Sequence, residues 1–439
     1  MLCPSVKKLV LAAFLFGIPL NALPLESHQA LAPRAANSGH LKGKFLHVTD
    51  IHIDPNYMAG SDPDQLCHRK SEDDDDNTAG KFGALHTKCD SPIPLVEASF
   101  KFMKESLQDV DFIIYTGDTA RHDRDDDKPR TKDDVLHDHK AVVKYFMDTY
   151  DVGDIPFIPT IGNNDPIEHN EVVKKDALFD DLKTIWKPFQ LDLKDSFDKG
   201  GYFYQDVIPG KLRVISLNTM FFYKKNDDVP DCDEKNGPGA VHLSWLEDAL
   251  KDTKKSGSKA YLIGHVPPND DDDEKIFKDK CHSKYINLLG KYSDVITGHF
   301  TDDMLSAVVK DHGDSYGHVS AVHKKKKLKD INADRAVTVM FNAPSILPSN
   351  NPAIRVYEYD TGSGDLPAGT IKDWNQYYVD LKKANKEDKV TYEKEYQASR
   401  LFGINHFDAA GIKKIFKKIA TDKKLRKQYS KYVKVSRKD

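Results

Sequence analysis

The sequence predicts an α/β fold, in which helices pack on the faces of a sheet. Three observations predict it: apolar runs of strand length, abrupt polar turns after these runs, and intervening segments with helical spacing of apolar residues. Of the 439 residues, 39% are apolar and 31% are charged, and the formal net charge is −4. A sizeable core is therefore available, which excludes a collagen-like or wholly disordered chain. The near-neutral charge argues against a general nucleic-acid binder, and no specific nucleic-acid partner is expected.

Residues 1–23 are predicted to direct export and not to join the fold. Lys7 and Lys8 precede an apolar run over residues 9–20, the basic start and short apolar stretch of a secretory signal. The run is short for a membrane span. A cleaved signal peptide and a signal anchor with its N-terminus in the cytosol therefore both remain open. Residues 24–43 are expected to be a linker.

The cysteines agree with an oxidising compartment. Apart from Cys3 in the N-terminal segment, the chain has Cys67, Cys89, Cys232 and Cys281, an even number that suits two disulfides. Three pairings are possible, and four unpaired thiols are the alternative. We favour Cys67–Cys89 with Cys232–Cys281, because each bond would close a loop around a polar insertion.

The apolar runs that carry the predicted sheet appear in a regular order. In chain order they are Phe45–Thr49, Asp111–Thr116, Pro156–Ile161, Ala260–Ile263 and Asp294–Thr297. Segments with helical spacing lie between them at Leu95–Leu107, Val135–Met147 and Leu243–Leu250. In such folds the turns after the carboxyl ends of the strands converge on the ligand site.

Those turns contain residues that bind metal ions. In chain order they supply Asp50, His52, Asp118, Asn163, His265 and His299. One such turn is more often a solvated loop, but this ordered set of hard and borderline ligands is able to hold two divalent ions with one bridging carboxylate. A glycine precedes four of the ligands and lets the backbone turn sharply there.

The ordered set resembles the calcineurin-like metallophosphoesterases over about residues 44–378. Two motifs are similar to the acid-sphingomyelinase-like branch of that family, Thr49–Pro55 and Gly117–Asp123. Three others are most similar to the fungal vacuolar endopolyphosphatases, Gly162–Asp165, Gly298–Asp303 and the stretch from Asn342 to Tyr359. The resemblance implies a four-layer α/β/β/α sandwich of two mixed sheets flanked by helices.

The resemblance also implies a division of the ligands between two ions. Asp50 and His52 would hold the first ion, Asp118 would bridge, and the second ion would be held by Asn163, His265 and His299. The ions would be Mn, Mg, Zn, Co or Fe. Thr301 stands where the family usually has a further first-site histidine, so water, Thr301, Asp302 or Asp303 is expected to complete that site.

Two residues are predicted to take part in catalysis, His122 and Asn164. The family usually has a histidine at the position of Asn164, as an acid or phosphate-stabilising group. A phosphate that leaves an anhydride has a final pKa of only about 6, so a phosphoanhydride needs less help from a general acid. His122 matches a catalytic histidine of the sphingomyelinase branch, and the alternative is a surface histidine in the charged run 121–130.

Two basic segments are candidate binding sites for a polyanion. Lys324, Lys325, Lys326 and Lys327 form a run that is either a solvated loop or a substrate-binding loop. Residues 379–439 are predicted to be a basic helical extension, and Asp408–Asp439 has 12 Lys+Arg against 3 Asp+Glu. Apolar residues recur there at helical spacing, at Ile412, Ile415, Phe416 and Ile419. This stripe is expected to pack on the catalytic domain, to contact an anionic membrane or to accompany a phosphate chain.

The resemblance implies an endopolyphosphatase, with residues 44–378 as the catalytic domain. A metal-bridging hydroxide would attack phosphorus in line, while both ions and His122 neutralise the equatorial oxygens. The alternatives are a sphingomyelinase-like phosphodiesterase acting on a phospholipid or nucleotide, and a non-catalytic relative that binds polyphosphate or membrane. Entry into the secretory pathway would lead to the vacuole, either in its lumen or as a single-pass type II membrane protein attached through the N-terminal apolar segment.

Overall fold

The protein is described from a computed structural model. The residues that the structure describes are 36, 41–270, 273–301, 305–311, 313, 315–321 and 335–436. The N-terminal apolar run, Asp302, Asp303 and the run Lys324–Lys327 lie outside these residues, so the predictions made for them stay predictions. Among the described helices, none has both the length and the apolar character that crossing a membrane requires.

One sheet carries the first three predicted strands at its centre and edge. Its strand order is β15 (Glu393–Gln397), β14 (Ile371–Tyr378), β13 (Ala353–Tyr359), β1 (Lys44–Val48), β4 (Phe112–Tyr115) and β5 (Phe157–Pro159). Strands β1, β4 and β5 run parallel, whereas β13 pairs antiparallel with β1. The sheet is therefore mixed, and the carboxyl ends of its parallel strands lie along one edge.

The other large sheet is also mixed. Its order is β11 (Tyr316–Ser320), β10 (Ser306–Lys310), β12 (Ala336–Asn342), β9 (Ile296–Thr301), β8 (Lys259–Ile263), β7 (Leu212–Ser216) and β6 (Phe203–Ile208). Strands β7, β8, β9 and β12 run parallel. Two short strands, β2 (Ile53–Asp54) and β3 (Ser91–Pro92), pair beside the first sheet.

Aromatic rings fill the space between the two large sheets. The ring of Phe45 on β1 stacks on Phe112 of β4 at a centroid distance of 4.9 Å and on Tyr357 of β13 at 5.0 Å. It also meets Phe300 of β9 edge to face at 5.3 Å and lies 5.4 Å from Tyr261 of β8. These contacts join the inner faces of the sheets, so the sheets form the two middle layers of the fold.

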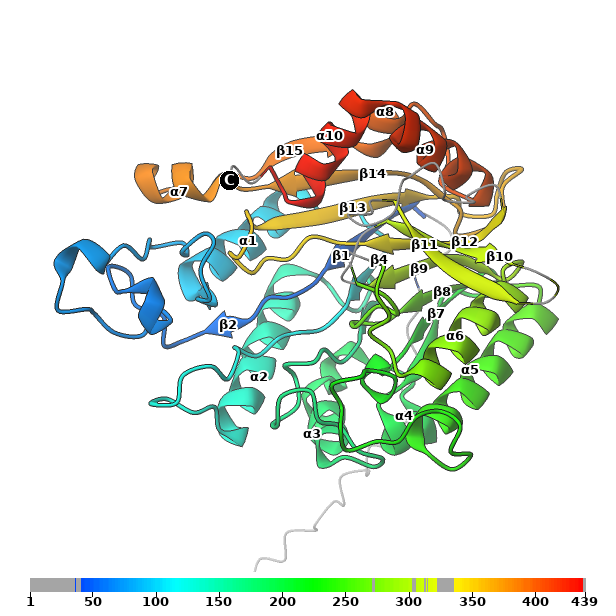
Figure 1. The fold of residues 1–439 in the computed structure, drawn as a ribbon, viewed down its shortest axis with the longest axis horizontal. Coiled ribbons are helices and arrows are strands. Elements are labelled where there is room, and N and C mark those ends of the chain that lie inside the picture. The colour runs from blue at the N-terminus through cyan, green and yellow to red at the C-terminus, as the bar shows by residue number, and fades with distance from the viewer. Residues whose placement is uncertain are drawn as a thin grey trace, which may run out of the picture. The chain divides into compact units, whose positions relative to one another are not determined.

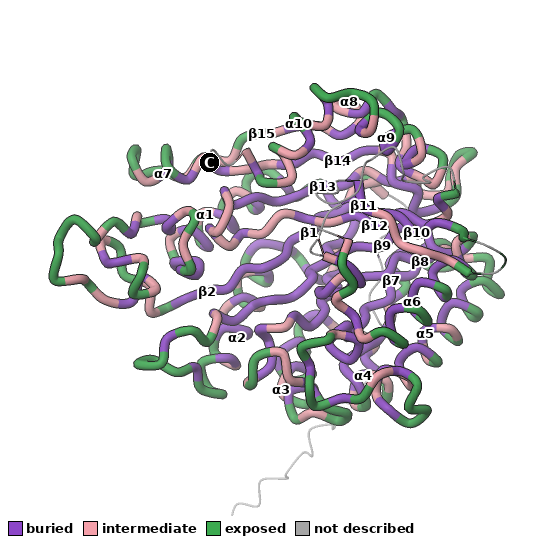
Figure 2. The backbone as a smooth tube through the Cα atoms, viewed as in Figure 1, coloured by how far each residue is buried: buried purple, intermediate pink, exposed green. Residues whose placement is uncertain are grey.

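Helices form the outer layers (Figure 1). Helices α1 (Ile93–Ser106) and α2 (Lys132–Thr149) cover the first sheet, where Phe146 of α2 contacts Tyr115 and Phe157. Helices α5 (Pro238–Lys255) and α6 (Asp279–Lys291) cover the second sheet and pack against each other. Helices α3 (Ala177–Ile185) and α4 (Lys194–Gly200) follow β5. The predicted α/β/β/α sandwich is confirmed, and Figure 2 shows its strands as mostly buried.

Residues 379–436 continue this fold. Helix α7 (Leu381–Glu387) leads to β15, which pairs with β14, and α8 (Ala398–Phe402), α9 (Ala409–Thr421) and α10 (Lys423–Val433) follow. Helix α9 contacts β12 and buries the apolar stripe predicted from the sequence, Ile412, Ile415, Phe416 and Ile419. The stripe therefore packs inside the protein, and only the charged face of the helix is left for a partner.

Both favoured disulfides are present. Cys67 is bonded to Cys89, and Cys232 is bonded to Cys281. The sulfurs of Cys67 and Cys89 are buried beside the short strands β2 and β3, whereas Cys232 is bonded to the start of α6. The predicted pairing is confirmed.

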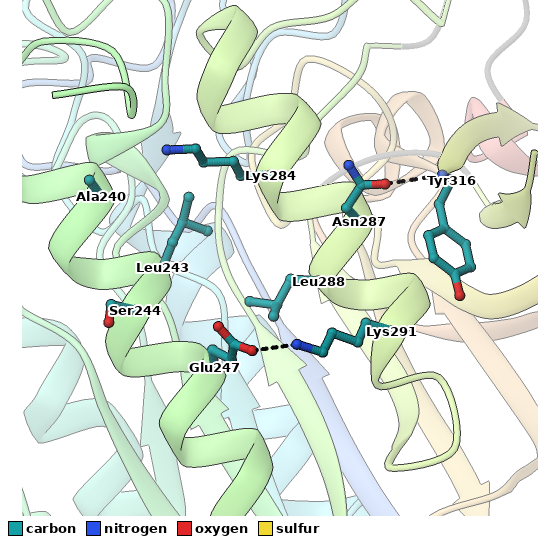
Figure 3. A pocket seen from close by; sticks show the side chains of 9 residues that line it. All are labelled: Ala240, Leu243, Ser244, Glu247, Lys284, Asn287, Leu288, Lys291 and Tyr316. Atoms are coloured by element: carbon teal, nitrogen blue, oxygen red, sulfur yellow. Dashed lines mark hydrogen bonds and ion pairs between the residues drawn. The ribbon is translucent and has the colours of Figure 1, made fainter. Parts of the chain in front are cut away.

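A cavity of about 650 Å³ lies between α5 and α6 (Figure 3). Its floor includes Leu243 and Leu288, and an ion pair of 2.7 Å joins Lys291 to Glu247 across it. No predicted site residue lines this cavity. It belongs to the packing of two outer helices and not to the edge at which the parallel strands end.

Candidate metal centre

The structure brings five of the predicted ligands together at the carboxyl edge of both sheets. Asp50 and His52 follow β1, Asp118 follows β4, Asn163 follows β5 and His265 follows β8. All five line one cavity of about 960 Å³. Four of the ligands come from the first sheet and one from the second, so the cavity lies where the two sheets meet.

Three of these ligands have a left-handed backbone. The φ angles of Asp50, His52 and Asp118 are 49°, 40° and 58°. This region costs a residue other than glycine roughly 1–3 kcal/mol, and such residues cluster at functional sites. Hydrogen bonds between the two turns hold the conformation, because Asp50 N–H donates to the carbonyl of Gly117 at 3.0 Å and His52 N–H donates to that of Asp118 at 3.1 Å.

The carboxylate of Asp118 lies at the centre of the cluster. Its Oδ2 is 3.1 Å from His52 Nε2 and 3.4 Å from His265 Nε2. Asn164 holds the same carboxylate from the other side, donating its backbone N–H to Oδ1 at 2.8 Å and its side-chain Nδ2–H to Oδ2 at 2.7 Å. The amide of Asn164 therefore orients the predicted bridging ligand, and its part in catalysis stays a prediction.

The histidine tautomers show that a cation fits here. His52 Nδ1–H donates to the carbonyl of Ala120 at 3.0 Å, and His265 Nδ1–H donates to that of Thr116 at 3.0 Å. The Nε2 atom of each imidazole then faces an oxygen of Asp118, and it carries either a proton or, in the neutral imidazole, a lone pair that a cation can bind. Two acceptors that face each other in a buried place need a positive charge between them, and either a proton or a divalent ion supplies it.

The electrostatics of the cluster are consistent with this. Burial by itself lowers the pKa of His52, but the carboxylates of Asp118, Asp50 and Asp90 together raise it by more, and the pKa of His52 lies well above its ordinary value. Burial by itself raises the pKa of Asp118, but His265 and His52 bring it well below its ordinary value. The carboxylate is therefore ionised and the cluster attracts a cation.

His122 lies in the same cavity and is oriented by a residue that we did not predict. Its Nδ1–H donates to Asp90 Oδ1 at 2.7 Å, and its backbone N–H donates to Asp90 Oδ2 at 2.7 Å. The imidazole stacks on that of His52 at a centroid distance of 4.2 Å. Burial and the neighbouring His52 lower the pKa of His122, and Asp90 opposes them. His122 is thus a partly buried member of the cluster, and its predicted role in catalysis fits this placement.

Asp165 ends the Gly162–Asp165 motif, and we predicted no role for it from the sequence. Its carboxylate, which is 1% exposed, accepts the backbone N–H of Gly162 at 2.7 Å, of Thr119 at 2.7 Å and of Asp118 at 3.1 Å. It therefore joins the turn after β4 to the turn after β5. The position of Asp165 three residues after Gly162 was the only signal for this role in the sequence.

His299 is not brought together with the other predicted ligands. We expected its strand to end at Thr297, but β9 continues to Thr301 because β8 pairs with His299 and Phe300, and β12 pairs with it from His299 to Thr301. His299 is therefore inside a strand, and its Nε2 lies 2.6 Å from the hydroxyl of Tyr285 on α6. It does not line the cavity, and its role as a second-site ligand stays a prediction.

The cavity wall also contains residues that sequence analysis missed. Besides the ligands, His122 and Asn164, it is lined by Asp64, Leu66, Thr87, Lys88, Cys89, Arg124, His169, Asn170, Tyr223, Lys225, Leu347 and Ser349. His169 and Asn170 hold Asn163, whose Nδ2 lies 3.0 Å from His169 Nε2 and 3.2 Å from Asn170 Oδ1. None of these residues follows a predicted strand directly, so the pattern of strand and turn did not select them.

Sequence comparison identifies the family. A sequence model described as calcineurin-like phosphoesterase matches residues 43–303, which is more than half of the chain. The chain belongs to the calcineurin-like phosphoesterase family. A second model, described as the C-terminal region of acid sphingomyelin phosphodiesterase, matches residues 329–439. Membership implies a site for two divalent metal ions, and the cluster around Asp118 supplies candidate ligands for it.

Related phosphoesterases include several fungal proteins named endopolyphosphatase. The chain is 36% identical to that of Cryptococcus neoformans over an alignment of 321 residues, which covers 65% of this chain and 47% of that protein. It is 37% identical to that of Saccharomyces cerevisiae over an alignment of 273 residues, which covers 59% of this chain and 39% of that protein. The match therefore spans about half the length of these relatives or less. A solved dimetal phosphatase from Danio rerio aligns with a TM-score of 0.41 at 9% identity, covering 76% of this chain and 95% of that chain.

Proposed function

We propose that this phosphoesterase is an endopolyphosphatase, which hydrolyses internal phosphoanhydride bonds of inorganic polyphosphate. The observation that carries the proposal is the cluster of Asp50, His52, Asp118, Asn163 and His265 in one wide cavity. The similarity to fungal endopolyphosphatases supports the choice of substrate.

Each ligand would hold a divalent ion through a defined atom. The Nε2 atoms of His52 and His265 face the cluster, because their Nδ1–H groups are bound to backbone carbonyls. Asp50 and Asp118 would bind through carboxylate oxygens, and Asn163 through its amide oxygen. When bound, the two ions would polarise a phosphoryl oxygen and make water a better nucleophile at neutral pH.

The chain's own residues contribute orientation and charge. Asn164 and Asp165 fix Asp118 and its turn, so the central carboxylate does not have to reorganise during the reaction. His122 presents its ring beside His52 and is held by Asp90, which places it to stabilise charge on the phosphoryl oxygens or to transfer a proton.

The substitution Asp118→Asn tests the function. We expect it to remove more than about nine tenths of the turnover on long-chain polyphosphate, because the cost of losing the central carboxylate is several kcal/mol at about 1.4 kcal/mol per tenfold. Metal content should fall in the same preparation. A gel of long-chain polyphosphate should show mid-length fragments before free phosphate with the wild type. Free phosphate alone, with long chains undiminished in length, would contradict internal cleavage.

A phosphodiesterase acting on a lipid head group is the second candidate, favoured by the match of residues 329–439 to the acid sphingomyelin phosphodiesterase region. The two candidates differ in substrate and not in the metal cluster. Turnover of sphingomyelin in mixed micelles, in the absence of turnover of polyphosphate, would decide for the phosphodiesterase.

For location, we propose the lumen of an acidic vacuole, with the N-terminal apolar segment as an export signal or membrane anchor. Two disulfides support an oxidising route to that compartment. Burial raises the pKa of Glu395 to about 7 and that of Asp138 to about 7. Both groups therefore make the folded state more stable at mildly acidic pH than at higher pH. Imaging of a C-terminally tagged protein in a fungal cell, with vacuolar and cytosolic markers, tests this location.

A further inference from the structure

Basic side chains from two different directions enter the cavity that holds the metal ligands. Among the described residues that line it, Lys88, Arg124 and Lys225 are basic, and all three are exposed. Asp64 is an acidic lining residue beyond the two carboxylates of the ligand cluster. The wall around the ligands is therefore mainly cationic, and it differs from the Lys324–Lys327 loop that the sequence suggested.

These basic residues come from loops of the two different large sheets. Lys88 precedes the short strand β3 and helix α1, and Arg124 follows β4, so both belong to loops of the first sheet. Arg124 Nη1–H donates to the carbonyl of Lys88 at 3.3 Å, which keeps these two residues side by side. Lys225 instead follows β7 and belongs to the second sheet. The cavity that holds the metal ligands is therefore lined by basic residues from a loop of each sheet.

Both loops are fixed by contacts within the protein. Lys88 adjoins Cys89, which is bonded to Cys67, and Cys89 N–H donates to Thr87 Oγ1 at 3.2 Å. On the other side, Asn226 is fully buried and its Nδ2–H donates to the carbonyl of Val172 at 3.0 Å. Lys88 and Lys225 are thus flexible side chains on held backbones, and binding a phosphate orders the side chain without ordering the loop.

We propose that Lys88 with Arg124 on one side, and Lys225 on the other, bind the phosphates that flank the cleaved bond of a polyphosphate chain. The proposal rests on the proposed function and names the subsites that make the cleavage internal. Each phosphate of the chain carries negative charge, so a chain that crosses the metal ligands from one sheet to the other has charged neighbours on both sides of the reacting phosphorus. A substrate with a single phosphoryl group reaches only the ligands.

The test compares the two sides separately. The variants are Lys88→Ala with Arg124→Ala, and Lys225→Ala alone, each loaded with the metal that best activates the wild type. Either variant should raise KM for long-chain polyphosphate by at least about threefold, since an exposed charge pair contributes up to about 1 kcal/mol. A plot of log(1/KM) against the logarithm of the salt concentration should have a negative slope in the wild type. The magnitude of that slope should fall by roughly 0.7 for each contact removed, by analogy with single-stranded nucleic acid. Metal content, and the inhibition constant of inorganic phosphate, should stay within about twofold of the wild type.

A matched control removes charges from the opposite edge of the second sheet. Lys211, Lys254 and Lys255 lie near the amino ends of β7 and β8, so their combined replacement by alanine lowers the net charge without touching the cavity. KM for polyphosphate should change less than twofold in that variant. An equal rise in the control would show a general charge effect and overturn the subsites.

The remaining outcomes also decide the proposal. A rise in KM in only one of the two cavity variants would overturn the two-sided arrangement, and an unchanged KM in both would overturn the subsites altogether. Wild-type protein in the same assay keeps the proposed function separate, because metal-loaded wild type without turnover of polyphosphate would refute the function itself.

Discussion

The substitution Asp165→Asn tests whether the site depends on the carboxylate that joins its two central turns. In the wild type, Asp165 accepts the N–H groups of Asp118, Thr119 and Gly162 while almost fully buried. Asparagine of the same shape retains one acceptor oxygen and turns an amide N–H toward a backbone N–H. Leaving a buried donor unpaired costs about 1–3 kcal/mol, and the other bonds lose the strength that a charged acceptor gives, so we expect a loss of about 3–5 kcal/mol in the free energy of unfolding.

The same change should weaken metal binding about 10- to 100-fold, the usual effect of removing a group that orients a ligand. Urea unfolding of the metal-free protein gives the stability, and titration of the refolded variant with Mn²⁺ gives the affinity. Asp176→Asn is the matched control, because Asp176 caps α3 through Leu178 N–H and asparagine caps a helix equally well. An Asp165→Asn protein whose stability lies within about 1 kcal/mol of the wild type, with unchanged Mn²⁺ affinity, would refute this reasoning.

Three further changes probe the surroundings of the site. His122→Ala should lower turnover about 10²–10⁴-fold and leave bound metal intact, and elemental analysis showing lost metal would make it a ligand instead. Replacing Cys67 and Cys89 by serine opens a loop with a sequence separation of 22 and should lower the free energy of unfolding by about 3 kcal/mol. Because Cys89 lines the cavity, turnover should fall too. Loss of the other disulfide should lower stability without changing turnover. Burial raises the pKa of Glu395 from 4.5 to about 7, so on raising the pH the folded state keeps this proton to a higher pH than the unfolded state does. The free energy of unfolding should therefore fall by about 3 kcal/mol as pH rises from about 4.5 to 7. Glu395→Gln should flatten that profile in thermal melts, and an unchanged slope would assign the pH dependence to other groups.

The parts of the site that sequence predicted are those fixed by local structure. The runs that became β1, β4, β5 and β8 are almost entirely buried apolar residues, so their ends are visible as sudden changes to polar residues. A ligand one to four residues beyond such an end must lie at the edge of the sheet. This is why the turns after those strands were recognised in the correct place, while the division of their side chains between two ions stays a prediction.

The parts that sequence did not predict depend on partners distant in the chain. Strand β9 includes His299 because β8 and β12 both pair with it there, and nothing near residue 297 reveals that pairing. Asp90 accepts a hydrogen bond from His122, which is 32 residues away in the chain. In the sequence, only its position next to Cys89 of a predicted disulfide pointed to Asp90. Lys225 belongs to a loop of the second sheet, so only the packing of the two sheets places it beside the ligands.

That packing also links metal binding to the stability of the whole sandwich. Thr160 Oγ1–H donates to the carbonyl of Leu217 at 2.6 Å, and Ser216 Oγ–H donates to that of Pro159 at 2.7 Å, so the end of β5 is bonded directly to the end of β7. His265 adds a third bond between the sheets through the carbonyl of Thr116. A ligand that binds the folded state alone stabilises it by RT ln(1 + [L]/Kd), and here ligands from both sheets would share the bound ions. Bound metal ions would therefore stabilise the junction between the sheets that forms their site. The left-handed backbone of Asp50, His52 and Asp118 costs conformational energy that this stabilisation would offset.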